Sequence, residues 1–167
     1  MSDIGVAIMD AAERRIRVGG FNGFSFREIA TDVGVKSSTV HYHFPTKELL
    51  AASVIHRYTE RIAELIDNGF AAEPDCIKIW VQAFRGTIYS VDRMCPSTVL
   101  GAETRDLPDK VSTAVQSFFE MCLERMTTQG MTLEGASQLL STIVGALLLA
   151  NALGDIKAYD RATRGML

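Results

Sequence analysis

The chain has 167 residues, of which 47% are hydrophobic and 22% charged, and it carries a formal net charge of −3 at pH 7. This composition supplies enough apolar side chains for a core and excludes a disordered chain, while the acidic total argues against indiscriminate binding to nucleic acid. Its three cysteines are too few and too irregularly spaced for a disulfide scaffold or a zinc site, so we expect a reducing compartment.

Two segments bear on location. The first five residues carry an acid before any base and no long apolar run, so we expect no secretory signal and a cytoplasmic protein. The most apolar run, Leu139 to Leu153, is shorter than the roughly 20 residues that cross a bilayer. We therefore expect a buried helix there and no membrane partner.

The spacing of apolar residues predicts an all-α chain, because the period-2 alternation of strands is missing. On the helix beginning at Lys47, the inner face should carry apolar side chains as far as Leu65 and Ile66. We expect about nine helices, over residues 3–18, 26–33, 37–44, 47–70, 74–88, a short one after Pro96, 108–126, 132–153 and a short one from Asp155.

The second and third of these helices form a helix-turn-helix pattern. Ser25 and Glu28 have the spacing of a capping box, and Gly34 can supply the left-handed residue of a tight turn. Either Ser37 or Ser38 should cap the next helix. A preceding helix and this pair of short helices together are how a DNA-binding head is built.

The third helix must end by Phe44, because Pro45 cannot continue it. We expect Phe44 to pack in the core and Tyr42 to lie on the surface. The other side chains of this helix are short polar or aromatic groups able to contact base edges and phosphates. They are Ser37, Ser38, Thr39, His41, Tyr42 and His43.

The run FREIATDVGVKSSTVHYHFPTKELL, residues 26–50, resembles the DNA-binding signature of the tetracycline-repressor (TetR) family. The resemblance implies a helix-turn-helix DNA-binding domain over residues 1–46 and a helical ligand-binding and dimerisation domain over residues 47–167. It also implies a homodimeric repressor that a small molecule releases from double-stranded operator DNA.

The same resemblance implies roles for individual residues. Arg27 would reach a guanine or a phosphate, His43 and Lys47 would touch phosphates, and His41 stands where the family usually has tyrosine. The predicted DNA-binding residues are Arg27, Lys36, Ser37, Ser38, Thr39, His41, Tyr42, His43 and Lys47. Because two histidines at i and i+2 on a helix point to different faces, we expect no metal there, and no cofactor is implied.

The charge of the predicted head differs from that of the whole chain. Residues 14–47 hold six basic and two acidic side chains, so the sequence predicts a local basic head on an acidic body.

The second half of the chain is rich in aromatic and sulfur-containing residues, which commonly line small-molecule pockets. Ordinary core packing is the alternative for each of them. The candidate inducer-binding residues are Tyr58, Trp80, Phe84, Tyr89, Met94, Cys95, Phe118 and Cys122.

Cys95 directly precedes Pro96, which fits the first position of a helix, so its thiol would lie where the helix dipole stabilises a thiolate. The stretch from Met94 to Phe119 also resembles, more loosely, electrophile- and acrylate-responsive members of the family. Either a sensing role or a structural role remains open for Cys95.

The helix ending at Leu153 is apolar almost all round and must be covered on several sides. Together with the last helix, Asp155 to Arg164, it predicts an isologous four-helix homodimer interface. The leading hypothesis is a ligand-responsive transcriptional repressor, not an enzyme. The alternatives are a small cysteine-dependent helical enzyme and a helical adaptor with a vestigial DNA-binding head.

Overall fold

The structure is a computed structural model that describes residues 2–89 and 94–167, and within these ranges every regular element is a helix. The expected all-α class is therefore confirmed. The elements are α1 (Asp3–Gly19), η1 (Phe21–Gly23), α2 (Phe26–Val33), α3 (Ser37–His43), α4 (Lys47–Ala72), α5 (Cys76–Tyr89), α6 (Pro96–Gly101), η2 (Thr104–Asp106), α7 (Asp109–Thr128), α8 (Leu133–Leu153), α9 (Lys157–Thr163) and η3 (Arg164–Met166).

The predicted caps of α2 are confirmed at both ends. The Ser25 amide donates to the Glu28 carboxylate at 2.8 Å, and the Glu28 amide donates back to the Ser25 hydroxyl at 3.3 Å. Gly34 follows the helix in the left-handed conformation with φ 76°. These reciprocal bonds satisfy amides that a helix start leaves unpaired, so α2 begins and ends where its sequence specifies.

The predicted cap of α3 is wrong. The helix begins at Ser37, and Lys36 occupies the N-cap position without a side-chain hydrogen bond. The Thr39 amide donates to the Lys36 carbonyl at 2.9 Å, so the first turn of α3 starts one residue before the serines. Ser37 and Ser38 therefore lie in the first turn of α3, where their hydroxyls are not needed as caps.

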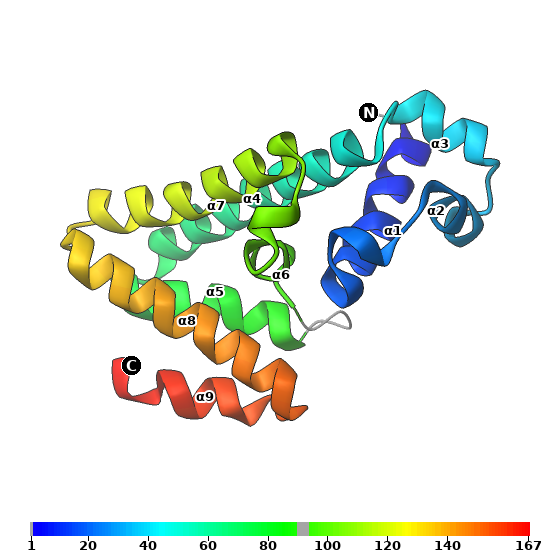
Figure 1. Ribbon diagram of the computed structural model, residues 1–167. Helices are drawn as coiled ribbons and strands as arrows, with labels where there is room; N and C mark the ends of the chain where they lie inside the picture. The colour runs from blue at the N-terminus through cyan, green and yellow to red at the C-terminus, as the bar shows by residue number, and fades with distance from the viewer. Residues whose placement is uncertain (1, 90–93) are drawn as a thin grey trace.

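Two regions are visible in Figure 1. Helices α1, α2 and α3 form a head at one end of α4, and α4 runs from the head into a body in which it packs against α5 and α7. Helix α8 lies against α7, α5 and α9, and α6 contacts both α7 and α1. The expected inner face of α4 is confirmed at Ile66, which is fully buried, but Leu65 is 48% exposed.

Helix α8 is 21 residues long, and by length and composition it could cross a membrane. In this fold Leu139, Ile143 and Leu147 are instead buried within the body. The core helix of a helical protein meets the same criteria of length and composition, which agrees with the expected buried helix.

Candidate nucleic-acid interface

Helix α3 is anchored on one side and bare on the other. Val40 is fully buried, and Phe44, directly after the helix, is 8% exposed, as expected. Ser38 and His41 are exposed, and the Tyr42 side chain is 85% exposed. The head therefore presents hydroxyl, imidazole and phenol groups on a short helix that the core holds in place.

Neighbouring rings support the aromatic side chains of α3. The His41 ring meets the edge of Phe26 at a centroid distance of 4.6 Å, and His43 meets Tyr42 at 5.4 Å. The two imidazole rings therefore pack against different aromatic rings. Among the described residues, no group of three or more His, Cys, Asp and Glu side chains could hold a metal ion.

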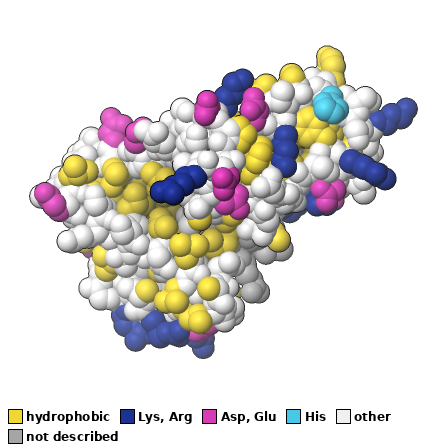
Figure 2. Space-filling model, in the orientation of Figure 1, with side chains coloured by type: hydrophobic (Ala, Val, Ile, Leu, Met, Phe, Trp, Pro, Cys, Tyr) yellow, Lys and Arg dark blue, Asp and Glu magenta, His cyan; other side chains and the backbone are white. Residues whose placement is uncertain are grey.

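The head also carries exposed positive charge. Arg14, Arg27 and Lys36 are exposed, and their side chains form no ion pair within the described part of the chain. Figure 2 shows Lys and Arg side chains projecting from the end of the molecule that α2 and α3 form, around a histidine. Unpaired surface cations next to a bare polar helix are suited to a polyanionic partner.

Lys47 is held more tightly than the sequence suggested. Its ammonium lies 4.6 Å from the ring centre of Phe21 and 4.7 Å from that of Phe24, and the side chain is half-buried at the start of α4. Burial lowers the pKa of this lysine, against an opposing effect of Glu28. The two rings fix the cation beside α3 through cation–π contacts.

Two of the six basic side chains counted in the head are paired with carboxylates inside the fold. Arg15 donates to Asp32 at 2.5 and 3.0 Å and to Glu28 at 3.1 Å, which joins α1 to α2. Its hydrogen bonds lower the pKa of Asp32. Arg17 pairs with Glu13 at 2.6 Å. Two of the six basic side chains are therefore neutralised internally and do not add to the charge that faces a partner.

Sequence reasoning missed a buried carboxylate at the junction of head and body. Glu13 of α1 is only 6% exposed and accepts hydrogen bonds from Arg17 at 2.6 Å, Arg61 at 2.5 Å and Arg57 at 3.0 Å. Burial alone would raise the pKa of Glu13, but the hydrogen bonds from Arg61 and Arg17 outweigh it and lower the pKa. The one local signal was the i, i+4 spacing of Glu13 and Arg17.

A second contact joins the head to the body near α6. The Phe21 amide donates to the Glu103 carboxylate at 3.2 Å, and Arg17 donates to the Met94 carbonyl. Gly20 lies beside that carboxylate with φ 64°, and an added Cβ would collide with it. The end of α1 is therefore fixed both to α4 and to the segment around α6.

The candidate inducer-binding residues form two groups. Tyr58, Trp80, Phe84 and Phe118 make a continuous buried ring cluster, with centroid distances of 5.5 Å for Tyr58–Phe118 and 6.3 Å for Trp80–Phe84 and Phe84–Phe118. The Trp80 indole also donates to Gln129 at 3.2 Å. Of this cluster, Tyr58 also lines a cleft between α4 and α5, so most of the set packs as core.

The second group contains sulfur. Met94, Cys95 and Cys122 are buried, and burial raises the pKa of the Cys122 thiol. Cys95 occupies the N-cap of α6, as expected, but its side chain is fully buried, so a reagent must first enter the fold to reach it. A sensing role for Cys95 stays a prediction. The Tyr89 side chain lies outside the described residues.

Comparisons with known proteins agree with this architecture. Residues 8–54 match the family model for bacterial regulatory proteins, tetR family. The chain is similar to a TetR-family transcriptional regulator from Agrobacterium tumefaciens, with 26% identity, 98% of this chain and 95% of that chain covered, and a TM-score of 0.88. It is also similar to a TetR transcriptional regulator from Legionella pneumophila, with 28% identity, the same coverages and a TM-score of 0.88.

A third structure, E. coli NemR in its reduced form, shares the fold with a TM-score of 0.81, at 17% identity over 98% of this chain and 95% of that one. No curated protein matches the sequence. The matched head and the similarity over nearly the whole length lead to one conclusion: residues 8–54 form a tetR-family helix-turn-helix head, and the chain as a whole has the fold of TetR-family DNA-binding transcription regulators.

Proposed function

We propose that the protein is a transcriptional repressor that binds pseudo-palindromic double-stranded DNA as a homodimer and is released by a small molecule bound in its body. The observation that carries this proposal is α3, which Val40 anchors while Ser38, His41 and Tyr42 remain exposed. A short helix that bares hydrogen-bonding groups and a phenol is suited to the major groove.

The cations around α3 would position the head without reading sequence. Arg27 and Lys36, both exposed, would meet phosphates beside the groove, and Lys47 would reach a phosphate from the start of α4. Two heads in a dimer would then contact half-sites about 34 to 36 Å apart, one turn of the duplex.

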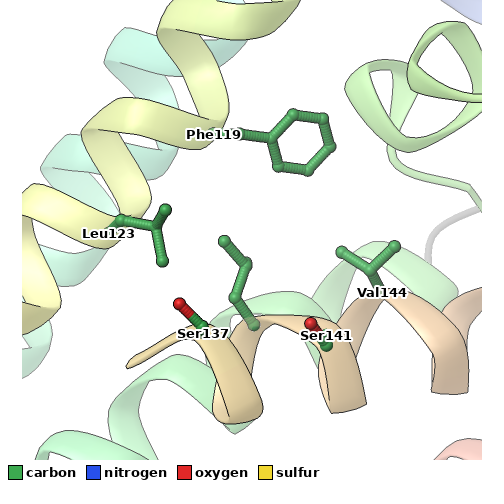
Figure 3. Close-up of a pocket in the computed structure, with 6 residues that line it drawn as sticks. Phe119, Leu123, Ser137, Ser141 and Val144 are labelled. Carbon is green, nitrogen blue, oxygen red and sulfur yellow. The ribbon is translucent and has the colours of Figure 1, made fainter. Parts of the chain in front are cut away.

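An exposed apolar surface supports the homodimer through the last two helices. Leu148, Leu149 and Leu153 of α8 are 43%, 48% and 59% exposed on one monomer. Beside them, a groove of about 270 Å³ separates α7 from α8 (Figure 3). Phe119 and Val144 lie on opposite sides of this groove.

Such a surface would be covered by the same surface of a second copy, as in an isologous dimer. We infer the two-fold arrangement from the resemblance to the family and not from a contact within one chain. The short α9, Lys157–Thr163, is fixed to α5 by the Tyr159 hydroxyl, which donates to the Val81 carbonyl at 2.8 Å. The α8–α9 pair is therefore held as a unit that can face its partner.

A binding role is favoured over a catalytic one, because the matched family and the similar structures are regulators. A DNA-binding repressor acts where the bacterial chromosome lies, so we place the protein in the cytoplasm. A small molecule in the body would then control how firmly the head holds its operator.

The proposal is tested by selecting sequences from a random double-stranded DNA pool with the purified protein and measuring their affinity over a salt series. We expect an inverted repeat whose half-sites lie about 10 base pairs apart, bound with steep salt dependence. His41→Ala should change the selected sequence, whereas His56→Ala, on the exposed surface of α4, should not. Failure to enrich any sequence would favour the adaptor or enzyme alternatives.

A further inference from the structure

The largest of the described pockets lies between α4 and α5, beside the end of α1. It has a volume of about 560 Å³, which is within the range of small-molecule sites. The guanidinium groups of Arg17 and Arg61 lie 5.4 and 5.3 Å from the ring centre of Tyr58. One end of the cleft therefore carries the half-exposed cation of Arg61, beside the Arg17 that is paired with Glu13, over an aromatic ring.

The rest of the cleft is largely apolar. Ile62, Leu65 and Ala83 line it, and Leu65 is the α4 residue that sequence analysis expected in the core. Its 48% exposure arises because its side chain borders this cleft. A cationic end joined to an apolar wall selects for a ligand that has an anionic group and a hydrocarbon part.

We propose that this cleft binds a small carboxylate with an apolar tail, and that Arg61 is its principal contact. This inference deepens the function proposed above, on which it rests, by naming the chemical class of the inducer. A guanidinium has five N–H donors and pairs favourably with a carboxylate. Arg61 is half exposed and spends one donor on Glu13, so several donors face the cleft or solvent.

Arg17 and the buried Tyr58 support the same end of the cleft. Arg17 is almost fully engaged, since it donates to Glu13 and to the Met94 carbonyl. The Tyr58 hydroxyl is buried near the Cys95 thiol, a weak partner, and has no stronger hydrogen bond among the described residues. The ring of Tyr58 thus forms the wall beneath the two guanidinium groups, while its hydroxyl is buried toward Cys95.

One acidic residue, Glu64, also lines the cleft and opposes an anion. Neutralising Arg61 and neutralising Glu64 should therefore change carboxylate affinity in opposite directions, and both changes can be measured. A merely structural role for the two side chains predicts no such opposition.

Binding at Arg61 would also act on the head. Arg61 and Arg17 hold Glu13, which belongs to α1, so a second carboxylate would compete with Glu13 for the same cations. Weakening this contact would loosen the head on α4. By linkage, operator DNA and the carboxylate would then reduce each other's affinity by the same factor.

The binding step is tested by calorimetric titration of the full chain, without DNA, using hexanoate and the neutral, equally long hexanamide. We expect hexanoate to bind at least about tenfold more tightly than hexanamide, as a charged hydrogen bond predicts. Arg61→Gln should lower hexanoate affinity by about tenfold, and Glu64→Gln should raise it severalfold. Arg161→Gln, an exposed arginine on α9, is the matched control and should change nothing.

Several outcomes would overturn the inference. They are equal affinity for hexanoate and hexanamide, no binding of hexanoate, and equal effects of Arg61→Gln and Arg161→Gln. Circular dichroism of each variant distinguishes loss of binding from loss of fold. Should Arg61→Gln unfold the chain, the rise expected for Glu64→Gln decides the matter alone.

Operator affinity, measured by fluorescence anisotropy on the selected DNA, distinguishes failure of the carboxylate site from failure of the proposed repressor function. Operator binding with no hexanoate binding refutes the carboxylate site and leaves the repressor intact. Hexanoate binding with no selected operator refutes the repressor and retains the site. With both present, we expect hexanoate to weaken operator binding by about fivefold or more, and no change would refute the coupling.

Discussion

Helices α3 and α8 each contact the core on one side and expose the other, yet their exposed faces differ in chemistry. Helix α3 buries Val40 and exposes hydroxyls, an imidazole and the phenol of Tyr42. Helix α8 buries seven side chains and exposes leucines, among them Leu148 and Leu149. The difference indicates two kinds of partner, because polar groups among unpaired cations suit a polyanion, whereas leucines suit a second apolar surface.

Between these two surfaces stands the Glu13 junction, which joins the head that carries α3 to the helix that leads into the body. We expect substitutions at the junction, at the apolar face of α8 and at the polar face of α3 to change different properties, namely stability, dimerisation and DNA binding. The predictions below follow that order, from the largest expected effect to the smallest.

Glu13→Ala should have the largest effect. Removal of the carboxylate leaves the buried Arg17 without its partner, so we expect the free energy of unfolding to fall by about 3 kcal/mol, measured by urea denaturation. Arg161→Ala breaks only the exposed pair with Asp155 and should leave that free energy unchanged within error. Similar losses for both variants would contradict the role of the junction.

The same carboxylate predicts a pH dependence. Its pKa in the folded state lies below the ordinary 4.5, so its contribution is complete above that value and is lost as the pH falls through the lower folded-state pKa. Stability measured between pH 7 and pH 3 should therefore fall less steeply at the acid end for Glu13→Gln than for the unmodified chain. Parallel curves would contradict the assigned shift.

The apolar face is tested by the double variant Leu148→Glu, Leu149→Glu. Two charges placed on the proposed dimer surface should raise the dimer dissociation constant by about 100-fold, or about 2.7 kcal/mol, in sedimentation equilibrium. Val18→Glu introduces a charge at an apolar side chain that is 85% exposed on α1, and it should leave the dimer intact. Dissociation in both variants, or in neither, would remove α8 as the interface.

The polar face is tested at its most exposed ring. Tyr42→Ala should weaken binding to the selected operator by about tenfold and alter which sequences are preferred, with little change on random DNA, because base contacts carry discrimination. Anisotropy with both DNAs measures the two effects. An equal loss on both would assign Tyr42 to the phosphate backbone instead.

Lys36→Ala should have the smallest effect. The loss of one phosphate contact would lower the slope of log affinity against log salt by about 0.9, uniformly across sequences. Lys47→Ala should lower the slope similarly but also weaken the head, since its ammonium rests on Phe21 and Phe24. A sequence-dependent loss for Lys36→Ala would indicate base reading at the start of α3.

Local signals predicted much of the head. The capping box of Ser25 and Glu28 and the left-handed Gly34 depend on residues within a few positions of one another. The family signature falls in the same short stretch. The cap of α3 was mispredicted, because the first turn of the helix starts at the Lys36 carbonyl and both serines lie inside it.

The junction and the cleft depend on pairings that a sequence does not display. Glu13 meets Arg57 and Arg61 at separations of 44 and 48 residues, and only the helix packing brings them together. Charge counting predicted the size of the basic excess but not which side chains carry it, because the pairing of Arg15 and Arg17 with carboxylates depends on how the helices pack. Periodicity placed Leu65 inside because it reports the face of a helix and not the edge of a cleft.

Trp80 is the sole tryptophan of the chain, fully buried, and its indole is bonded to Gln129 where α5 meets α7. Intrinsic indole fluorescence therefore originates entirely from the interior of the body. A change in emission on adding a ligand would report rearrangement there, whereas unfolding confined to the head would leave the spectrum nearly unaltered. The chain thus carries its own optical probe for distinguishing events in its two halves.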